Sequence, residues 1–260
     1  MAVLRCDFFS DALSLSTSMT VILPQATRTQ IGLAGTASAS PPPVLYLLHG
    51  MSDDHTTWLR RTSIERYVAP LGLAVVIPQV HRSYYTDEAY GGSFWTFLSD
   101  ELPGLVRGFF RVSERREDTF VAGLSMGGYG AMKWALREPG RFAAAASLSG
   151  ALDIAGTTLT RSRPEDPMLA RRLFGEATVA GSDADLLHLL AQADPAALPA
   201  LRLWCGRQDG LLSASQRFHQ ACTAAGLPVE LEVGAGDHDW AYWDARIRDV
   251  LAWLPLPSPA

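Results

Sequence analysis

The stretch Gly123-Leu124-Ser125-Met126-Gly127 lies where a strand pattern meets a helix pattern. Asp118–Ala122 before it is short, apolar and rich in β-favouring residues, whereas Met126–Arg137 after it places Ala, Met, Trp and Leu at helical spacing. A serine on a sharp strand-to-helix turn needs very small residues two positions away on either side, because the backbones crowd there. The two flanking glycines meet this need. The stretch therefore predicts a turn that holds the Ser125 hydroxyl out at the edge of a sheet.

The rest of the chain repeats the alternation of strand and helix around this turn. Continuous apolar runs predict buried strands at Val44–Leu48, Leu73–Ile77, Phe142–Leu148, Leu201–Cys205 and Val229–Val233. Helical patterns fall between and after them, at Thr56–Val68, Thr96–Phe110, Ser213–Ala225 and Trp240–Leu254, with Pro103 expected to kink or restart the second. Val3–Phe9 and Leu15–Leu23 predict an antiparallel pair at one sheet edge, and a loop follows over Gln25–Pro43. We therefore expect an α/β fold with a mostly parallel central sheet and helices on both faces.

The composition is that of a core-forming globular protein and argues against a polyanion-binding surface. The 260 residues are 48% hydrophobic and 19% charged, which favours one α/β domain spanning residues 1–260. The net charge of −5 argues against a nucleic-acid partner. Arg5, Asp7 and Asp11 interrupt any apolar leader, and no run of about 18 apolar residues predicts a membrane span. We expect a cytoplasmic protein with no membrane partner, and the three scattered cysteines suggest neither a metal site nor a disulfide framework.

One long segment breaks the alternation after the sixth strand. Residues 150–199 contain polar loops and two short helical stretches, Met168–Phe174 and Asp185–Ala191, but no strand pattern. An insertion of this length on the carboxyl side of a sheet serves either as a lid over the site or as an oligomer contact. We favour a contribution to a lid.

A serine hydroxyl becomes an effective nucleophile only when a histidine removes its proton and an acid orients that histidine. In a sheet of this kind the partners follow in the order Ser, acid, His, each after a later strand. His219 falls inside a helix pattern, whereas His238 follows the strand at Val229–Val233 through a glycine-rich turn at 234–236. We therefore predict Ser125 as the nucleophile and His238 as the base.

The acid is less sharply defined by the sequence. Asp209 comes shortly after the strand Leu201–Cys205, where a triad acid is expected, although it could simply cap the next helix. Asp153 is the rival position after the preceding strand, and Asp237 and Asp239 flank His238 but would reach its ring poorly from the adjacent backbone. We predict that Asp209 holds the tautomer of the histidine.

A tetrahedral oxyanion needs two backbone donors. The N–H of Met126, directly after the nucleophile, should be one. The loop His49-Gly50-Met51-Ser52 follows the strand Val44–Leu48, and its Gly50 permits a close approach to substrate, so the N–H of Met51 is our second candidate. We expect His49 to brace this loop by hydrogen bonding. We predict no metal and no cofactor.

Aromatic side chains gather around the predicted loops. Ordinary packing explains several of them, but the glycine-broken loop Tyr84–Trp95 follows a strand end, where substrates bind. We predict that substrate contacts come from Trp58, Tyr85, Trp95 and Trp240, with the last forming a wall of the acyl pocket.

Taken together, these residues resemble the tributyrin esterase family, within the esterase D-like α/β-hydrolases of the putative esterase family. The matching motifs cover most of the chain in the family's order: Leu47-Leu48-His49-Gly50-Met51-Ser52 with Trp58, Tyr85-Thr86-Asp87, Glu101-Leu102-Pro103, Gly123-Leu124-Ser125-Met126-Gly127-Gly128-Tyr129-Gly130, and Asp237-His238-Asp239-Trp240 with Trp243. The resemblance implies an α/β-hydrolase fold, hydrolysis of short-chain carboxylic esters as small-molecule substrates, no cofactor, and a homo-oligomer in many members. It also implies a triad of Ser125, Asp209 and His238.

Two features depart from the family, and related branches supply rival functions. Asp53 occupies a position where family members tend to carry glycine, and the loop Thr27–Pro43 is long for the family. S-formylglutathione hydrolases, a related branch, use the same chemistry on a thioester. An acyltransferase would pass the acyl group to an alcohol, and a non-catalytic binding module would have little physical reason to keep all three triad partners.

Overall fold

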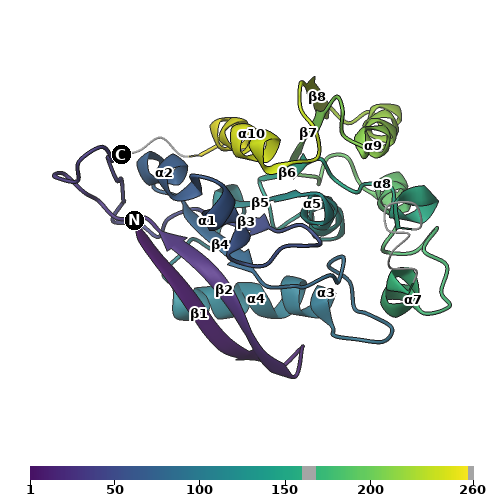
Figure 1. The fold of residues 1–260 in the computed structure, drawn as a ribbon, viewed down its shortest axis with the longest axis horizontal. Helices are drawn as coiled ribbons and strands as arrows, with labels where there is room; N and C mark the ends of the chain where they lie inside the picture. The colour runs from purple at the N-terminus through teal and green to yellow at the C-terminus, as the bar shows by residue number, and fades with distance from the viewer. Residues whose placement is uncertain (160–167, 257–260) are drawn as a thin grey trace.

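The computed structural model describes residues 1–159 and 168–256. Within them one sheet of eight strands forms the centre of the fold, in the order β1-β2-β4-β3-β5-β6-β7-β8 (Figure 1). The strands are β1 (Ala2–Ser10), β2 (Leu15–Leu23), β3 (Val44–Leu48), β4 (Ala74–Pro78), β5 (Thr119–Leu124), β6 (Ala144–Leu148), β7 (Ala200–Gly206) and β8 (Glu230–Gly234). Strands β3 to β8 pair in parallel, whereas β1 pairs with β2, and β2 with β4, in the antiparallel sense. The predicted α/β class, the mostly parallel sheet and the antiparallel edge pair are confirmed.

Helices cover both faces, as continuous apolar strands require. They are α1 (Thr57–Arg61), α2 (Ile64–Val68), α3 (Phe94–Thr96), α4 (Leu102–Phe109), α5 (Met126–Arg137), α7 (Leu169–Phe174), α8 (Leu186–Gln192), α9 (Leu212–Ala224) and α10 (Trp240–Trp253). Because side chains alternate along a strand, Leu45 and Leu47 of β3 pack with α1, α2 and α10, while Tyr46 and Leu48 pack with the cluster that contains α4, α5 and α9. Both faces of the sheet are therefore covered by apolar side chains and shielded from water.

The prediction of one continuous helix over Thr56–Val68 is wrong, because two short helices, α1 and α2, occupy this segment. Thr62 adopts an extended conformation (φ −133°, ψ 173°), and its hydroxyl donates to the carbonyl of Trp58, so α1 ends there and α2 begins at Ile64. Competition of a threonine hydroxyl with the helix backbone explains the break. The restart expected near Pro103 is present, because a π-helical turn at Phe97–Glu101 leads into α4, whose second residue is that proline.

The insertion after β6 is attached to the core at several described positions. A π-helical turn (Ile154–Thr158), α7 and α8 occupy it, and no strand occurs in its described residues. The carbonyls of Leu173 and Arg172 accept bonds from the N–H groups of Ala89 and Tyr90, and the hydroxyl of Tyr129 donates to the carbonyl of Ala184. Residues 160–167, part of the predicted lid or oligomer contact, lie outside the described residues. Among the helices of the described chain, none has the length and apolarity to cross a bilayer.

Candidate active site

The turn at Ser125 has the strained geometry that its sequence predicts. Strand β5 ends at Leu124, and Ser125 sits at φ 54° and ψ −117° before α5 begins. Neither flanking position has room for a side chain, because a Cβ on Gly123 would lie 2.3 Å from the carbonyl oxygen of Gly127, and one on Gly127 would lie 2.4 Å from that of Leu48. The serine is thereby held between strand and helix with its hydroxyl outside the sheet edge.

Three loops at the carboxyl ends of β5, β7 and β8 bring a serine, an aspartate and a histidine into one chain of hydrogen bonds. The Nε2 atom of His238 lies 3.0 Å from the Oγ atom of Ser125. Its Nδ1 atom lies 2.9 Å from Oδ2 and 3.1 Å from Oδ1 of Asp209. This arrangement can take a proton from the serine hydroxyl at one ring nitrogen while the carboxylate holds the other.

Asp209 is the buried end of this chain. Its side chain is 0% exposed, against 34% for His238. Burial acts to raise the pKa of Asp209, but the hydrogen bond and charge of His238, with bonds from Ser149 and the N–H of Leu211, hold that pKa below its ordinary value. The carboxylate is therefore ionised at neutral pH, which is the state that orients an imidazole.

The rival acids are occupied elsewhere. Asp153 binds the guanidinium of Arg217 at 2.7 Å and accepts a bond from the N–H of Gly156. Asp237 accepts the backbone N–H of His238 at 2.7 Å, and Asp239 caps α10 by accepting the N–H of Tyr242. The structure thus brings Asp209, and not these three, to the ring of His238.

The imidazole of His238 is packed from one side by a buried tryptophan. The ring of Trp243 stands perpendicular to it, with 4.9 Å between the ring centroids. The indole N–H of Trp243 donates to the hydroxyl of Ser149, which in turn bonds Asp209. Trp243 and Ser149 therefore position the acid–base pair. Ser149 follows β6, one strand away from Asp209, and nothing in its local sequence distinguishes it.

The segments that carry the two predicted oxyanion donors lie against each other, because a Cβ on Gly127 would meet the carbonyl oxygens of Leu48 and His49. Met126 is the first residue of α5, so its N–H has no partner within its own helix. Met51 follows Gly50 in the loop after β3, and no acceptor among the described residues takes its N–H. Both candidates for the oxyanion donors therefore have unused hydrogen-bonding capacity.

His49 braces this loop, as expected. Burial lowers its pKa to about 4, so the ring is neutral. Its Nδ1 donates to the carbonyl of Gly50 at 2.7 Å, and its Nε2 accepts the N–H of Val80 at 3.2 Å. The ring links the loop after β3 to the segment after β4.

The predicted substrate-contacting aromatics mostly lie behind the site. Trp58 and Tyr85 are 0% exposed, and each uses its polar atom to hold the oxyanion loop: the indole N–H of Trp58 donates to the carbonyl of Leu48, and the hydroxyl of Tyr85 to that of His49. The expectation that these two line the substrate pocket is corrected, because both side chains are fully buried and their polar ends are bonded to backbone carbonyls of the loop. Trp240 is half-buried, with its ring perpendicular to those of Trp58 and Trp243.

The fourth predicted contact, Trp95, belongs to a cluster that the sequence did not reveal. It is 8% exposed and faces the Nζ atom of Lys133, 4.8 Å from its ring centroid, and the guanidinium of Arg137. Lys133 is the only lysine of the chain. It is buried in α5, donates to the carbonyl of Tyr85 and the hydroxyl of Thr86, and burial lowers its pKa to about 7. The sequence feature that could have indicated this cluster is the position of the single lysine within the largely apolar helix Met126–Arg137.

A cavity of about 450 Å³ opens beside the oxyanion loop. Met51, Ser52, Asp53 and Phe94 line one part of it, and the ion pair between Arg172 and Glu88, 3.3 Å apart, lines another. Its position next to Met51 makes it a candidate for holding one side of a substrate. In the described part of the chain, no group of three His, Cys, Asp or Glu side chains is arranged to bind a metal ion.

Several known esterases and serine hydrolases are similar to this chain in sequence and in fold. The model of the family described as "Putative esterase" matches residues 12–254. An acetyl esterase of Caldicellulosiruptor saccharolyticus is 30% identical over 266 residues, covering 99% of this chain and 100% of that protein. The fluorophosphonate-binding serine hydrolase FphF of Staphylococcus aureus, solved with substrate bound, superposes with a TM-score of 0.87 at 34% identity, covering 97% of this chain and 98% of that one. An S-formylglutathione hydrolase, FrmB, of the same organism gives a TM-score of 0.83 at 33% identity, with the same coverage.

Proposed function

The chain belongs to the putative esterase family and is a carboxylic ester hydrolase, and on that basis we propose that it cleaves short-chain acyl esters through an acyl-enzyme on Ser125. The observation that carries this proposal is the continuous chain of bonds from Asp209 through His238 to the serine hydroxyl, at 2.9 Å and 3.0 Å. The acetyl esterase relative favours a small acyl group.

The proposed reaction runs in two halves. Nε2 of His238 takes the proton of the Ser125 hydroxyl as Oγ bonds to the ester carbonyl carbon, and the carbonyl oxygen becomes an oxyanion. The N–H groups of Met51 and Met126 donate to that oxyanion, each worth about 3 kcal/mol of barrier in enzymes of this kind. The imidazolium then gives its proton to the departing alkoxide, leaving an acyl group on Oγ.

Water completes the second half through the same groups. Nε2 of His238 takes a proton from water as the water oxygen bonds to the acyl carbon. The bond from that carbon to Oγ then breaks, the imidazolium gives its proton to Oγ, and the acid leaves with Ser125 restored. Asp209 stays ionised throughout and keeps Nδ1 as the protonated nitrogen. No cofactor enters either half, and the proposed partner is a small ester. The cytoplasmic location and the homo-oligomer stay predictions.

A second candidate is a thioesterase acting on S-formylglutathione, favoured by the similarity to FrmB over nearly the whole of both chains. The chemistry at Ser125 is the same, and only the leaving group, a thiolate, differs. The arginine side chains of Arg82 and Arg172 around the cavity beside Met51 would suit the carboxylates of glutathione.

The test is hydrolysis of p-nitrophenyl esters from acetate to palmitate, and of S-formylglutathione, by wild type and by Ser125→Ala. Rates that peak between about two and six carbons, and fall by about four to six decades in the variant, would support the esterase. Residual activity within tenfold of wild type would overturn the assignment of Ser125. A strong preference for the thioester selects the second candidate. Added alcohol that captures most of the acyl group would reveal an acyltransferase.

A further inference from the structure

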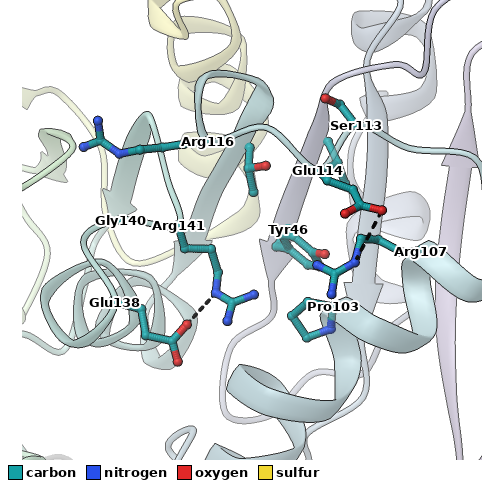
Figure 2. Close-up of a pocket in the computed structure, with 11 residues that line it drawn as sticks. Tyr46, Pro103, Arg107, Ser113, Glu114, Arg116, Glu138, Gly140 and Arg141 are labelled. Carbon is teal, nitrogen blue, oxygen red and sulfur yellow. Dashed lines mark hydrogen bonds and ion pairs between the residues drawn. The ribbon is translucent and has the colours of Figure 1, made fainter.

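A second cavity lies at the opposite end of the central strands, away from the site of Ser125. It has a volume of about 390 Å³ and is framed by the first residues of β3 and β5, Val44 and Thr119, by α4, and by the loop after α5 (Figure 2). Since β5 runs six residues before it reaches Ser125, about 20 Å separate the two places. The proposed ester chemistry uses none of its side chains.

Cationic groups gather around this cavity. Arg107 comes from α4 and Arg141 from the loop after α5, beside the two acids Glu114 and Glu138 (Figure 2). Arg116, from the turn before β5, also lines the cavity, but its guanidinium turns away and donates to the carbonyls of Pro139 and Ala197. The two guanidinium groups that face the cavity are matched in charge by Glu114 and Glu138. An anion would therefore be held by hydrogen-bond donors of these arginines that the two acids leave unused.

The two acids leave most donors of the guanidinium groups unused. Glu138 accepts bonds from the Nε atom of Arg141 and from the indole N–H of Trp134, and reaches no terminal nitrogen of Arg141. Glu114 approaches the Nε atom of Arg107 at 4.0 Å, with its own side chain 73% exposed. A guanidinium has five N–H donors, and among the described residues the terminal nitrogens of both arginines have no acceptor. Figure 2 shows the guanidinium of Arg141 turned toward Tyr46 and Arg107.

The floor of the cavity supplies a further hydrogen-bond donor. The side chain of Tyr46 is 3% exposed, and its hydroxyl bonds no other group among the described residues. Burial raises the pKa of Tyr46 to about 12, with Arg107 and Arg141 acting in the opposite direction, so the hydroxyl keeps its proton at neutral pH. The hydroxyl keeps contact with the cavity and is not sealed inside the protein, so its proton is available to an acceptor bound there. Its ring is held by Trp134, 5.2 Å away.

We propose that this cavity binds a small oxyanion, a phosphate or carboxylate group, between the guanidinium groups of Arg107 and Arg141 and the hydroxyl of Tyr46. Three donor groups from three elements converge on one space, and planar guanidinium groups match the geometry of such anions. The volume accommodates a compound larger than the anionic group itself. The ligand is therefore a phosphorylated or carboxylated metabolite, bound apart from the ester.

The test is isothermal titration of the whole protein with inorganic phosphate and, separately, with citrate, at constant ionic strength set by sodium chloride. We expect saturable one-site binding of at least one probe. Arg107→Gln and Arg141→Gln should each weaken it about tenfold or more, and Tyr46→Phe about fivefold, as for lost hydrogen bonds to charged groups. Tighter phosphate binding identifies a phosphate ligand, and tighter citrate binding a carboxylate.

Matched controls separate this site from general salt effects and from the site of Ser125. Arg115 lies beside Arg116 but pairs with Glu117 and Asp118 outside the cavity, so Arg115→Gln should bind as wild type does. His238→Ala should also leave the affinity unchanged. Because the hydroxyl of Tyr46 bonds no other group within the described chain, and phenylalanine keeps the ring that packs on Trp134, Tyr46→Phe should remain folded, which circular dichroism verifies. No saturable binding of either probe, or equal losses in Arg115→Gln and Arg141→Gln, would overturn the proposal.

Discussion

The Nζ atom of Lys133 donates to the carbonyl oxygen of Tyr85 across 3.0 Å, and the hydroxyl of Tyr85 donates to the carbonyl of His49 across 2.9 Å. The helix that follows the nucleophile is thereby joined to the loop that carries the second oxyanion donor. Met126 begins the same helix, so one buried amine helps to set the distance between the two donors. Both backbone segments depend on a residue that touches neither substrate nor serine.

Lys133 should make stability depend on pH. Its pKa is about 7 in the folded protein and near 10.4 in an unfolded chain, so between those values the unfolded state binds more protons and stability rises with pH. We expect the free energy of unfolding to climb from pH 7 to 8.5 with a slope of up to about 1.4 kcal/mol per pH unit from this group. Urea unfolding of wild type and Lys133→Met measures it, and equal slopes would exclude the effect.

Replacing Asp209 by Asn should reduce turnover by about four decades while leaving the fold intact. The amide cannot stabilise the imidazolium and favours the wrong tautomer of His238. Steady-state hydrolysis of p-nitrophenyl acetate gives the rate. Asp153→Asn is the matched control, because Asp153 pairs with Arg217 and should leave turnover near that of wild type. A larger loss in the control would transfer the role of acid to Asp153.

The strain at Ser125 predicts an order of stability between two inactive variants. With φ at 54°, any residue other than glycine costs about 1–3 kcal/mol there, whereas glycine adopts such angles freely. Ser125→Gly should therefore unfold at higher urea concentration than Ser125→Ala, by about 1 kcal/mol after the greater chain entropy of glycine is counted. Equal midpoints would show that the turn is not strained.

Two glycine substitutions should have opposite effects. A Cβ on Gly127 would lie 2.4 Å from the carbonyl oxygen of Leu48 and 2.8 Å from that of His49, both backbone atoms, so Gly127→Ala should cost about 3 kcal/mol or more. Gly104 in α4 has nothing within 4 Å of its Cβ position, and Gly104→Ala should stabilise by up to about 1 kcal/mol. Thermal melts of both proteins provide the comparison.

Asp53 should moderate the reaction through its charge. Its carboxylate accepts the N–H of Gly50, next to Met51, at 3.2 Å, and burial raises its pKa. A negative charge near a developing oxyanion opposes it, so Asp53→Asn, which keeps the acceptor, should raise kcat about three- to tenfold. Asp54→Asn is the control, since Asp54 pairs with Thr56 and Arg60 instead. An unchanged kcat in Asp53→Asn would remove this role.

The strands were the most predictable part of the fold, because a strand buried on both faces must be apolar along its whole length. Val44–Leu48 and the helix Met126–Arg137 have the bounds that the pattern predicts. The break between α1 and α2 was not predictable, since it depends on a hydrogen bond from the hydroxyl of Thr62 to the carbonyl of Trp58. Helix propensities of the individual residues do not indicate whether such a side-chain bond forms.

Within the candidate site, the order of Ser125, Asp209 and His238 along the chain was informative because each follows a different parallel strand. The aromatic residues were less so. Their positions in the sequence place Trp58 and Tyr85 near the site, but do not indicate whether these side chains contact substrate or support the oxyanion loop from the protein interior. The roles assigned to Lys133 and Tyr46 depend on contacts with residues far away in sequence, and only the folded structure shows which residues these are.

The distances along the chain that separate the reacting groups also set an order of events in refolding. Ser125 and His238 are 113 positions apart, and strands β6, β7 and β8 must all pair before their side chains meet. Contacts between distant segments form late, because a long loop must close first. After dilution from denaturant, tryptophan fluorescence should therefore recover before ester cleavage does. The time at which ester hydrolysis first becomes measurable would then report when pairing of the sheet is complete.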